Sequence, residues 1–181
     1  MDHEVSNIHA RLDALEEEMM ALRRELVVKL ARAPTSDAEL EVLQCRAAQQ
    51  RFGLLLGSIE VVVPVAQLLP LPETPPWVLG SLNHHGTNIV VVDVAHRLTG
   101  TPHVIEPTEL IVICSTEWRQ VGLLVEEVLD VVSIEAGAVK DPAPGLHFAS
   151  FLAGVIDHEI GSLPLIEVSR LAAEFLNAEE K

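Results

Sequence analysis

The stretch GSLNHHGTNIVVVD, residues 80–93, holds the residues of this sequence that are best suited to chemistry. Its adjacent histidines, His84 and His85, have the side chains of transition-metal ligands. Ser81, His84 and Asp93 have the residue types of a nucleophile, a base and an orienting acid. Neighbouring residues of a strand point to opposite faces, however, and no nucleophile-elbow pattern surrounds the serine. No Cys, Asp or Glu at ligand spacing joins the histidines, so the pattern disfavours both a metal site and an enzyme.

Structural roles account for the same side chains and for other reactive ones. Asp93 precedes a short helical pattern, so its carboxylate is expected to accept hydrogen bonds from the free amides of a helix N-terminus. Trp77, in the Pro-rich stretch ETPPWV, is expected to plug the core beneath a loop, with an interface anchor as the alternative. Cys45 and Cys114 lie in apolar runs without zinc-like spacing, which predicts two reduced, buried thiols. We expect neither a cofactor nor a bound metal.

The elements that position these residues are short and mostly strand-like. Runs rich in Val, Ile and Leu alternate with clusters of Gly, Pro, Asn, Asp and Thr, which indicates a sandwich or small barrels. The strand-like runs are Glu39–Ala47, Phe52–Leu56, Ile89–Val92, Leu110–Cys114, Val121–Val125, Val128–Ile134 and Leu163–Ile166. Helical patterns in this region are limited to Val94–Leu98 and Val168–Asn177.

Residues 1–33 carry a different, heptad pattern. Its a and d positions are Val5, Ile8, Leu12, Leu15, Met19, Leu22 and Leu26. A seam confined to a and d is typical of a coiled coil. In a parallel, in-register pair, Arg11 would meet Glu16 of the second helix, and Glu18 would meet Arg23. We therefore expect a homodimer through this helix, with a single amphipathic helix docked on its own domain as the alternative.

The charge balance limits the possible partners. The chain has 27 acidic and 12 basic residues, and residues 34–181 hold 20 of the acids and 7 of the bases, a net of −13. A domain this negative repels phosphate backbones and anionic lipid, so we expect no nucleic-acid partner. No apolar stretch reaches transmembrane length, and the opening MDHEVSNIHARLD is charged rather than signal-like. These features predict a cytoplasmic protein that is not inserted in a membrane.

An internal repeat contains the opening motif. LGSLNHHGTNIVVVDV (79–94) aligns without gaps with AGVIDHEIGSLPLIEV (153–168). The matched pairs include Gly80 with Gly154, Leu82 with Ile156, Asn83 with Asp157, His84 with His158, and Asp93 with Glu167. The shared order of strand, Asn/Asp turn, strand, acid and helical turn predicts two similar subdomains, each with its own small core.

Three motifs follow one another along the same region. The first is PPWVLGSLNHHG (75–86), preceded by LLPLPETP (68–75) and followed by an apolar strand and Asp93; the second is VGLLVEEVLDVVSI (121–134). The third is GVIDHEIGSLPLIEVSRL (154–171). In this order and spacing, from about Glu39 to Phe175, the chain resembles a CheW domain, the chemotaxis coupling module.

The resemblance implies a fold, a function and a set of binding residues. The fold is mainly β, with two small SH3-like five-stranded β-barrels over 39–177, after an N-terminal helix over 1–33 and a linker over 34–38; residues 178–181 form a tail. The function is a non-catalytic adaptor that couples methyl-accepting chemoreceptor tips to the regulatory domain of a CheA-type histidine kinase, in membrane-associated arrays. The implied partner-binding residues are Ile59, Glu60, Val61, Asn83, His85, Gly86, Val121, Gly122 and Leu123.

The chain also departs from the family pattern. His85 stands where the family has Arg, and an ungapped alignment places Val61, beside Glu60, where the family commonly has Glu. Glu126 replaces the Asp of the second motif. These departures leave open an adaptor or decoy for a divergent receptor or kinase outside flagellar chemotaxis. A histidine-based metalloenzyme is the remote alternative.

Overall fold

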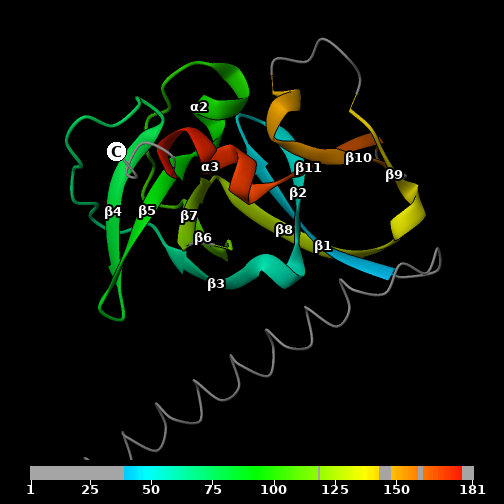
Figure 1. The fold of residues 1–181 in the computed structure, drawn as a ribbon, viewed down its shortest axis with the longest axis horizontal. Helices are drawn as coiled ribbons and strands as arrows, with labels where there is room; N and C mark the ends of the chain where they lie inside the picture. Colours follow the sequence, from blue (N-terminus) through cyan, green and yellow to red (C-terminus); the bar gives the residue numbers. More distant parts are fainter. Residues whose placement is uncertain (1–38, 118, 143–147, 159–160, 177–181) are drawn as a thin grey trace, which may run out of the picture. The chain divides into compact units, whose positions relative to one another are not determined.

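The computed structural model describes residues 39–117, 119–142, 148–158 and 161–176 (Figure 1). The predicted N-terminal helix with its heptad seam, the linker over 34–38 and the tail lie outside these residues. None of the described helices has the length and hydropathy of a membrane span.

Strands dominate the described residues, as the sequence predicts. They are β1 (Glu39–Ala47), β2 (Gln50–Leu55), β3 (Ile59–Pro64), β4 (Val78–His84), β5 (Thr87–Asp93), β6 (Leu110–Ser115), β7 (Gln120–Val125), β8 (Glu127–Glu135), β9 (Val139–Lys140), β10 (Leu152–His158) and β11 (Gly161–Ile166). The α-helices are α2 (Val94–Thr99) and α3 (Val168–Leu176), and the 3-10 helices are η1 (Leu56–Ser58), η2 (Ala136–Ala138) and η3 (Ala149–Phe151).

The strands form two sheets rather than the two closed five-stranded barrels that the family resemblance implies. One sheet has six strands in the order β8-β1-β2-β11-β10-β9, and the other has five in the order β3-β6-β7-β5-β4. In the described residues no ladder joins β3 to β4 or β8 to β9, so neither sheet closes. At the outer edge of β4, an isolated bridge between Leu69 and Ser81 occupies part of the position that a closing strand would need.

The repeat predicted from the match between 79–94 and 153–168 has the same geometry in both sheets. β4 and β10 begin at residues 78 and 152, and α2 and α3 begin at residues 94 and 168, so the equivalent elements keep the predicted alignment. Both hairpins have a register shift at the same place, between Val78 and Gly80 and between Leu152 and Gly154. Each hairpin then adds in parallel to a strand of its sheet, β5 to β7 and β11 to β2.

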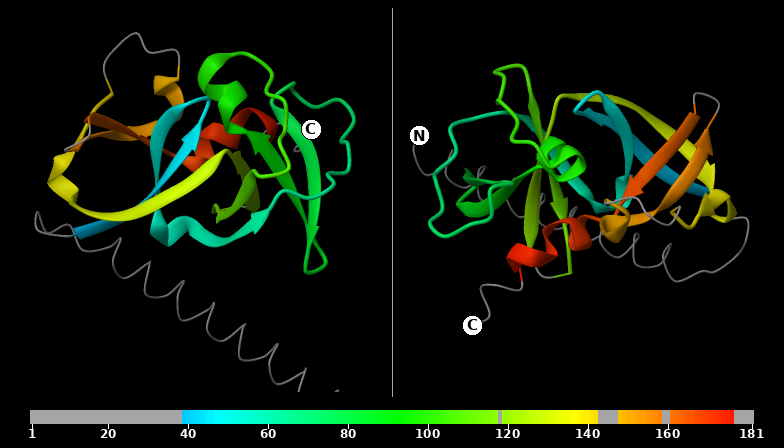
Figure 2. Two further views of the ribbon diagram at one scale, coloured as in Figure 1. Left: turned by 180° about the vertical axis from the view of Figure 1, so that it is seen from behind. Right: turned by 90° about the horizontal axis from the view of Figure 1, so that it is seen from above.

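A second repeat, which was not predicted from the sequence, completes the two halves. β1–β2 corresponds to β6–β7, because Cys45 pairs with Phe52 as Cys114 pairs with Val121. The five-stranded half is continuous along the chain, from β3 to β7, whereas the six-stranded half joins β1–β2 to β8–β11. Figure 2 shows the two halves side by side, with α2 and α3 where they meet.

Three hydrophobic clusters explain why the strands are apolar on both faces. The largest joins the two halves and contains buried residues of both sheets, of α2 and of α3. A second cluster lies on the other face of the five-stranded sheet, and a third on the other face of the six-stranded sheet. In β5, for example, Val90 and Val92 belong to the shared cluster, and Ile89 and Val91 to the second. Each half therefore has its own core, as predicted, and shares a larger one.

Candidate functional site

The sheet topology brings most of the predicted binding residues to one end of the five-stranded half. β3 begins beside the end of β6, because Ile59 pairs with Cys114, and β6 ends where β7 begins. β5 runs parallel to β7, so the β4–β5 hairpin turn lies beyond the start of β7. The start of β3, the β6–β7 turn and the β4–β5 turn therefore share one end of the sheet.

The β4–β5 turn is the exposed part of this site. His84 pairs with Thr87, and the two residues between them, His85 and Gly86, have φ values of 50° and 85°. Positive φ at both positions is the requirement of a type I′ turn. The Asn83 side chain accepts a hydrogen bond from the Gly86 amide at 3.2 Å and donates one to the Asn88 side chain at 3.1 Å.

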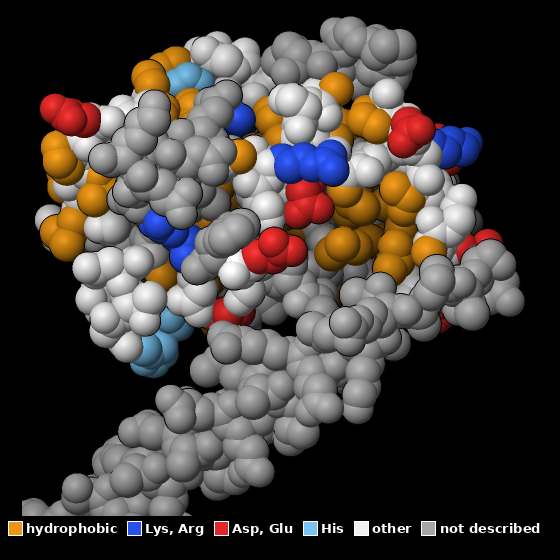
Figure 3. Space-filling view, in the orientation of Figure 1, with side chains coloured by type: hydrophobic (Ala, Val, Ile, Leu, Met, Phe, Trp, Pro, Cys, Tyr) orange, Lys and Arg blue, Asp and Glu red, His pale blue; other side chains and the backbone are white. Residues whose placement is uncertain are grey.

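The two histidines of this turn contact each other at the surface. Their rings are in edge contact, with centroids 4.3 Å apart, and His85 is exposed while His84 is half-buried. Figure 3 shows histidine side chains at the surface at its lower left, where Figure 1 places the hairpin turn. In the described part of the chain, no group of three or more His, Cys, Asp or Glu side chains could hold a metal ion.

The start of β3 supplies a partly buried carboxylate. Glu60 lies at a register shift of β3, and its side chain accepts hydrogen bonds from the hydroxyl of Ser115 and the amide of Gln120. These partners close the β6–β7 turn, so Glu60 ties the edge strand to it. Ile59 and Val61 flank it on an edge strand and are partly exposed.

The third predicted group is buried. Val121 and Leu123 are 0% exposed and belong to the shared cluster, because β7 is a central strand covered on both faces. A Cβ atom on Gly122 would lie 2.9 Å from Ile111 Cγ2, so this residue is covered too. These buried residues pack beneath the surface of the candidate site. The accessible part of the candidate site consists of the β4–β5 turn and the start of β3.

The catalytic set considered in the sequence is not assembled. Ser81 and His84 lie three residues apart on β4, which separates them by roughly 10 Å at the rise of a strand. Asp93 lies at the far end of the hairpin, is 1% exposed and accepts a hydrogen bond from the His96 amide at 2.9 Å. It is the N-cap of α2, as predicted. Trp77 is 7% exposed and fills the shared cluster, which confirms the buried plug.

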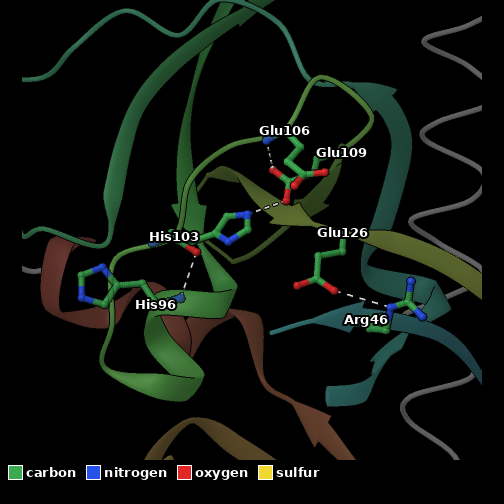
Figure 4. A network of polar contacts seen from close by, with 7 residues as sticks. Arg46, His96, His103, Glu106, Glu109 and Glu126 are labelled. Atoms are coloured by element: carbon green, nitrogen blue, oxygen red, sulfur yellow. Dashed lines mark hydrogen bonds and ion pairs between the residues drawn. The ribbon is translucent and has the colours of Figure 1, made fainter. Parts of the chain in front are cut away.

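A polar network that was not predicted from the sequence fastens the connection from α2 to β6 (Figure 4). Glu109 is 3% exposed; one carboxylate oxygen pairs with His103 Nε2, and the other accepts the Glu106 amide at 3.1 Å. The His103 amide donates to the second oxygen of Asp93 at 3.4 Å. The connection is thus tied to the cap of α2 and to the start of β6. The spacing His103–Glu106–Glu109 was the available signal, but a charged loop is usually solvated.

Arg46 fixes the point where the chain crosses from one half to the other. Its guanidinium lies 3.5 Å from Glu126 and 2.7 Å from Glu127, and its carbonyl accepts the Glu126 amide at 2.9 Å. Figure 4 shows the contact with Glu126, the residue that replaces the family Asp. This acid therefore has a structural partner within the chain.

The two cysteines are free and buried, as predicted. Burial raises the pKa of the Cys45 thiol to about 12. Burial also raises the pKa of Cys114 strongly, with smaller contributions from Cys45 and Glu60. Both thiols are neutral at physiological pH, which leaves them without the thiolate that metal binding or nucleophilic chemistry requires.

Comparisons with known proteins agree with this geometry. The family model for the CheW-like domain matches residues 41–175. A chemotaxis protein CheW of Rhizobium meliloti (strain 1021) is 28% identical over 133 residues, which cover 71% of this chain and 84% of that protein. Chemotaxis protein CheW of Thermotoga maritima is 30% identical over 96 residues, covering 53% of this chain and 63% of that protein.

A solved structure shows the same fold. The scaffolding protein TtCheW from Thermoanaerobacter tengcongensis superposes with a TM-score of 0.67 at 22% identity, covering 77% of this chain and 90% of that one. The family to which these proteins belong is one of non-catalytic scaffolds, which fits a site built from an exposed turn and an edge strand. The chain therefore belongs to the CheW-like domain family and is a chemotaxis-type scaffold protein rather than an enzyme.

Proposed function

We propose that this protein couples chemoreceptor tips to the regulatory domain of a CheA-type histidine kinase, and that it does so in the cytoplasm at receptor arrays. The observation that carries the proposal is that the exposed β4–β5 turn and the start of the edge strand β3 lie at the same end of the five-stranded sheet, on its two opposite edges. Edge strands and exposed turns are the parts of a β domain that remain available to a protein partner.

The accessible surface we assign consists of Ile59, Glu60, Val61, Asn83, His85 and Gly86. Glu60 is held by Ser115 and Gln120, and Asn83 orders the turn through the Gly86 amide, so both sides of the surface are preorganised. Preorganisation lowers the entropic cost of binding. Val121, Gly122 and Leu123 are assigned a supporting role beneath it.

Direct binding tests the proposal. The full chain is titrated by calorimetry with the kinase regulatory domain and with a receptor cytoplasmic tip from the same genome. We expect saturable 1:1 binding to each. Binding to one partner only would favour the decoy interpretation, and binding to neither would overturn the coupling function.

The internal repeat provides a matched control for the surface. Asn83 and Asp157 occupy equivalent positions of the two hairpins, and both are exposed. Asn83→Ala is expected to weaken binding of at least one partner about tenfold, which corresponds to about 1.4 kcal/mol, whereas Asp157→Ala leaves both affinities unchanged. Equal effects of the two variants would remove the binding role from the β4–β5 turn.

His85 decides between the common and the divergent partners. Arg has a permanent charge and a planar set of donors that His lacks. If the partners are those of the wider family, His85→Arg strengthens or preserves binding. A loss of binding in His85→Arg would show instead that the partners have adapted to histidine.

We further propose that the adaptor is a homodimer through the heptad seam of residues 1–33, which would raise the effective concentration of neighbouring binding sites. Leu15→Glu with Leu22→Glu in the full chain places charges in the seam and is expected to convert a dimer to a monomer in sedimentation. A monomeric mass for both proteins would refute the dimer, and a dimeric mass for both would refute the role of the seam.

A further inference from the structure

One arginine contacts aromatic rings from both halves of the domain. The guanidinium carbon of Arg97, on α2, lies 4.5 Å from the ring centroid of Trp77 and 5.1 Å from that of Phe151. Trp77 immediately precedes β4 of the five-stranded half, and Phe151 ends η3, immediately before β10 of the six-stranded half. Both distances lie within the range of a cation–π contact.

The two rings are equivalent members of the internal repeat. Residues 77 and 151 correspond when the gapless alignment of 79–94 with 153–168 is extended toward the N-terminus. Their carbonyls accept equivalent bonds, from the Asp93 amide at 2.8 Å and from the Glu167 amide at 2.9 Å. Trp77 and Phe151 are 7% and 3% exposed and belong to the shared cluster. Each ring is therefore fixed to the end of its own hairpin before Arg97 contacts it.

The arginine itself breaks the repeat. At the equivalent position of α3 stands Leu171, which is 0% exposed and lies in the same cluster. A leucine at position 97 would satisfy an apolar cluster without the cost of placing a cation beside it. A guanidinium, in contrast, is planar and always charged, and it stacks on aromatic faces. Because Arg97 contacts both rings at once, it favours one relative position of the two rings, which aliphatic packing alone specifies less sharply.

We propose that Arg97 is the positioning residue that sets the relative orientation of the two halves. Each half also has a smaller cluster of its own, on the face of its sheet that does not contribute to the shared cluster. The shared cluster holds the halves together, and Arg97 selects one arrangement among those that aliphatic side chains would tolerate. For an adaptor, this orientation determines how binding surfaces on the two halves are placed relative to each other. This consequence rests on the proposed function, whereas the role of Arg97 in the orientation does not.

Distances between spin labels on the two halves test whether Arg97 sets their relative orientation. Gln67 and Glu41 are exposed residues of the five-stranded and six-stranded halves, and labels are attached after changing both to cysteine. The native thiols are 0% exposed with raised pKa values, so the labels attach to the introduced cysteines. Electron–electron double resonance then reports the distribution of label distances.

The chain offers a matched control for the arginine. Arg170 lies on α3, and its guanidinium donates to the Leu152 carbonyl at 3.0 Å, a contact within one half. Arg97→Leu is expected to broaden or shift the distance distribution, while Arg170→Leu leaves it unchanged. Arg97→Lys, which keeps the charge without the planar group, is expected to restore the native distribution in part.

Circular dichroism and urea unfolding are recorded for every variant, and only folded samples are compared. If Arg97→Leu does not fold, Arg97→Lys carries the test alone, with a distribution broader than that of the native protein as the expected result. A native distribution in every folded Arg97 variant would overturn the proposal, and so would equal broadening in Arg170→Leu.

A binding experiment on the same variants tests whether the orientation of the two halves matters for function, separately from whether Arg97 sets that orientation. If the adaptor binds both partners, Arg97→Leu is expected to retain binding of each partner alone and to lose formation of the ternary complex in gel filtration. Retention of the ternary complex alongside a broadened distribution would overturn the functional consequence. If the unsubstituted chain binds neither partner, the coupling function fails, and the spin-label result still decides the role of Arg97.

Discussion

The two halves of the domain share one topology but are assembled differently along the chain. The five-stranded half is a continuous segment from β3 to β7, while the six-stranded half combines β1–β2 with β8–β11. The joining strands β2 and β11 are far apart in sequence, so their pairing closes a long loop that contains the whole five-stranded half. The comparison teaches that one hairpin–helix unit can complete a sheet in either arrangement, provided that a parallel partner strand is available.

The halves also differ in what their equivalent hairpins present. The first hairpin ends in the exposed turn with His85 and Gly86. The second carries Asp157, which forms an exposed ion pair with Lys140 of β9. The same backbone unit therefore contributes a candidate binding turn in one half and a self-contained charge pair in the other.

The largest expected difference between the halves concerns equivalent glycines. Gly80 has φ of 135°, and a Cβ atom there would lie 2.4 Å from the Leu69 carbonyl oxygen. Gly80→Ala combines backbone strain with a clash against backbone, so we expect a loss of about 3 kcal/mol or more in urea unfolding.

Gly154→Ala is the matched variant in the other half. The added Cβ atom would lie 2.3 Å from a side-chain atom of Val139, on the two-residue strand β9, and 2.9 Å from the Lys140 carbonyl oxygen. A short edge strand can shift more easily, so we expect a loss of about 1–2 kcal/mol. A greater loss for Gly154→Ala than for Gly80→Ala would show that β9 cannot shift to make room for the added methyl group.

The equivalent cysteines predict how stability depends on pH. The thiol of Cys45 has a pKa of about 9 in the unfolded chain, and burial raises this pKa to about 12 in the folded protein. Above pH 9 the unfolded state binds fewer protons than the folded state, so the free energy of unfolding falls as pH rises. We expect each cysteine to contribute a slope of about 1 kcal/mol per pH unit in this window.

Urea unfolding at pH 8, 9 and 10 measures this slope, and Cys45→Ala and Cys114→Ala provide the comparison. Because both thiols lie in the shared cluster and both have raised pKa values, each variant is expected to flatten the slope by a similar amount. An unchanged slope in either variant would show that its thiol ionises as readily in the folded protein as in the unfolded chain.

The exposed turn predicts smaller effects. Gly86→Ala places a side chain at φ of 85° with nothing within 4 Å, so only the backbone cost of about 1 kcal/mol is expected. His85→Asn is expected to raise stability by about 0.5 kcal/mol, because asparagine tolerates positive φ better than histidine in this type of turn. Thermal unfolding of both variants measures these effects; destabilisation by His85→Asn would argue against the type I′ geometry.

Small effects are also expected for the Lys140–Asp157 ion pair of the six-stranded half and for the two ion pairs of Arg46 at the crossover. The Lys140 and Asp157 side chains are 67% and 68% exposed, so Lys140→Ala is expected to change stability by less than about 0.5 kcal/mol. Arg46 is 44% exposed and contacts two acids, so Arg46→Ala is expected to cost no more than about 1 kcal/mol after solvent screening. Unfolding at low and at high salt separates the charge contribution, and a salt-independent loss in Arg46→Ala would assign the effect to packing.

Local sequence patterns predicted the individual elements well because those patterns depend on near neighbours. The run Glu39–Ala47 is β1 as expected, and the acid at position 93 caps α2. The strand β3 was not among the expected runs, because its sequence IEVVVP ends in proline and lacks alternation. An edge strand that is partly exposed on both faces does not require alternation.

The candidate site was predictable only in part. The turn residues Asn83, His85 and Gly86 carry a local signal, and the structure places them in an exposed turn. The burial of Val121 and Leu123 follows from the position of β7 in the sheet, which periodicity does not report. The signal for the second repeat was present in FGLL (52–55) and VGLL (121–124), but the spacing of these two stretches differs from that of the first repeat.

By itself the sequence determined the β-rich class, the hairpin–helix repeat of 79–94 and 153–168, and the membership suggested by ordered motifs, since each depends on residues close together in the chain. Only the tertiary structure decided that the sheets stay open, that β1–β2 completes the half formed by β8–β11, and that Arg97 meets Trp77 and Phe151. These features depend on pairing and packing between distant segments. Such contacts form when a shared core is buried, and no local pattern encodes which distant surfaces will share it.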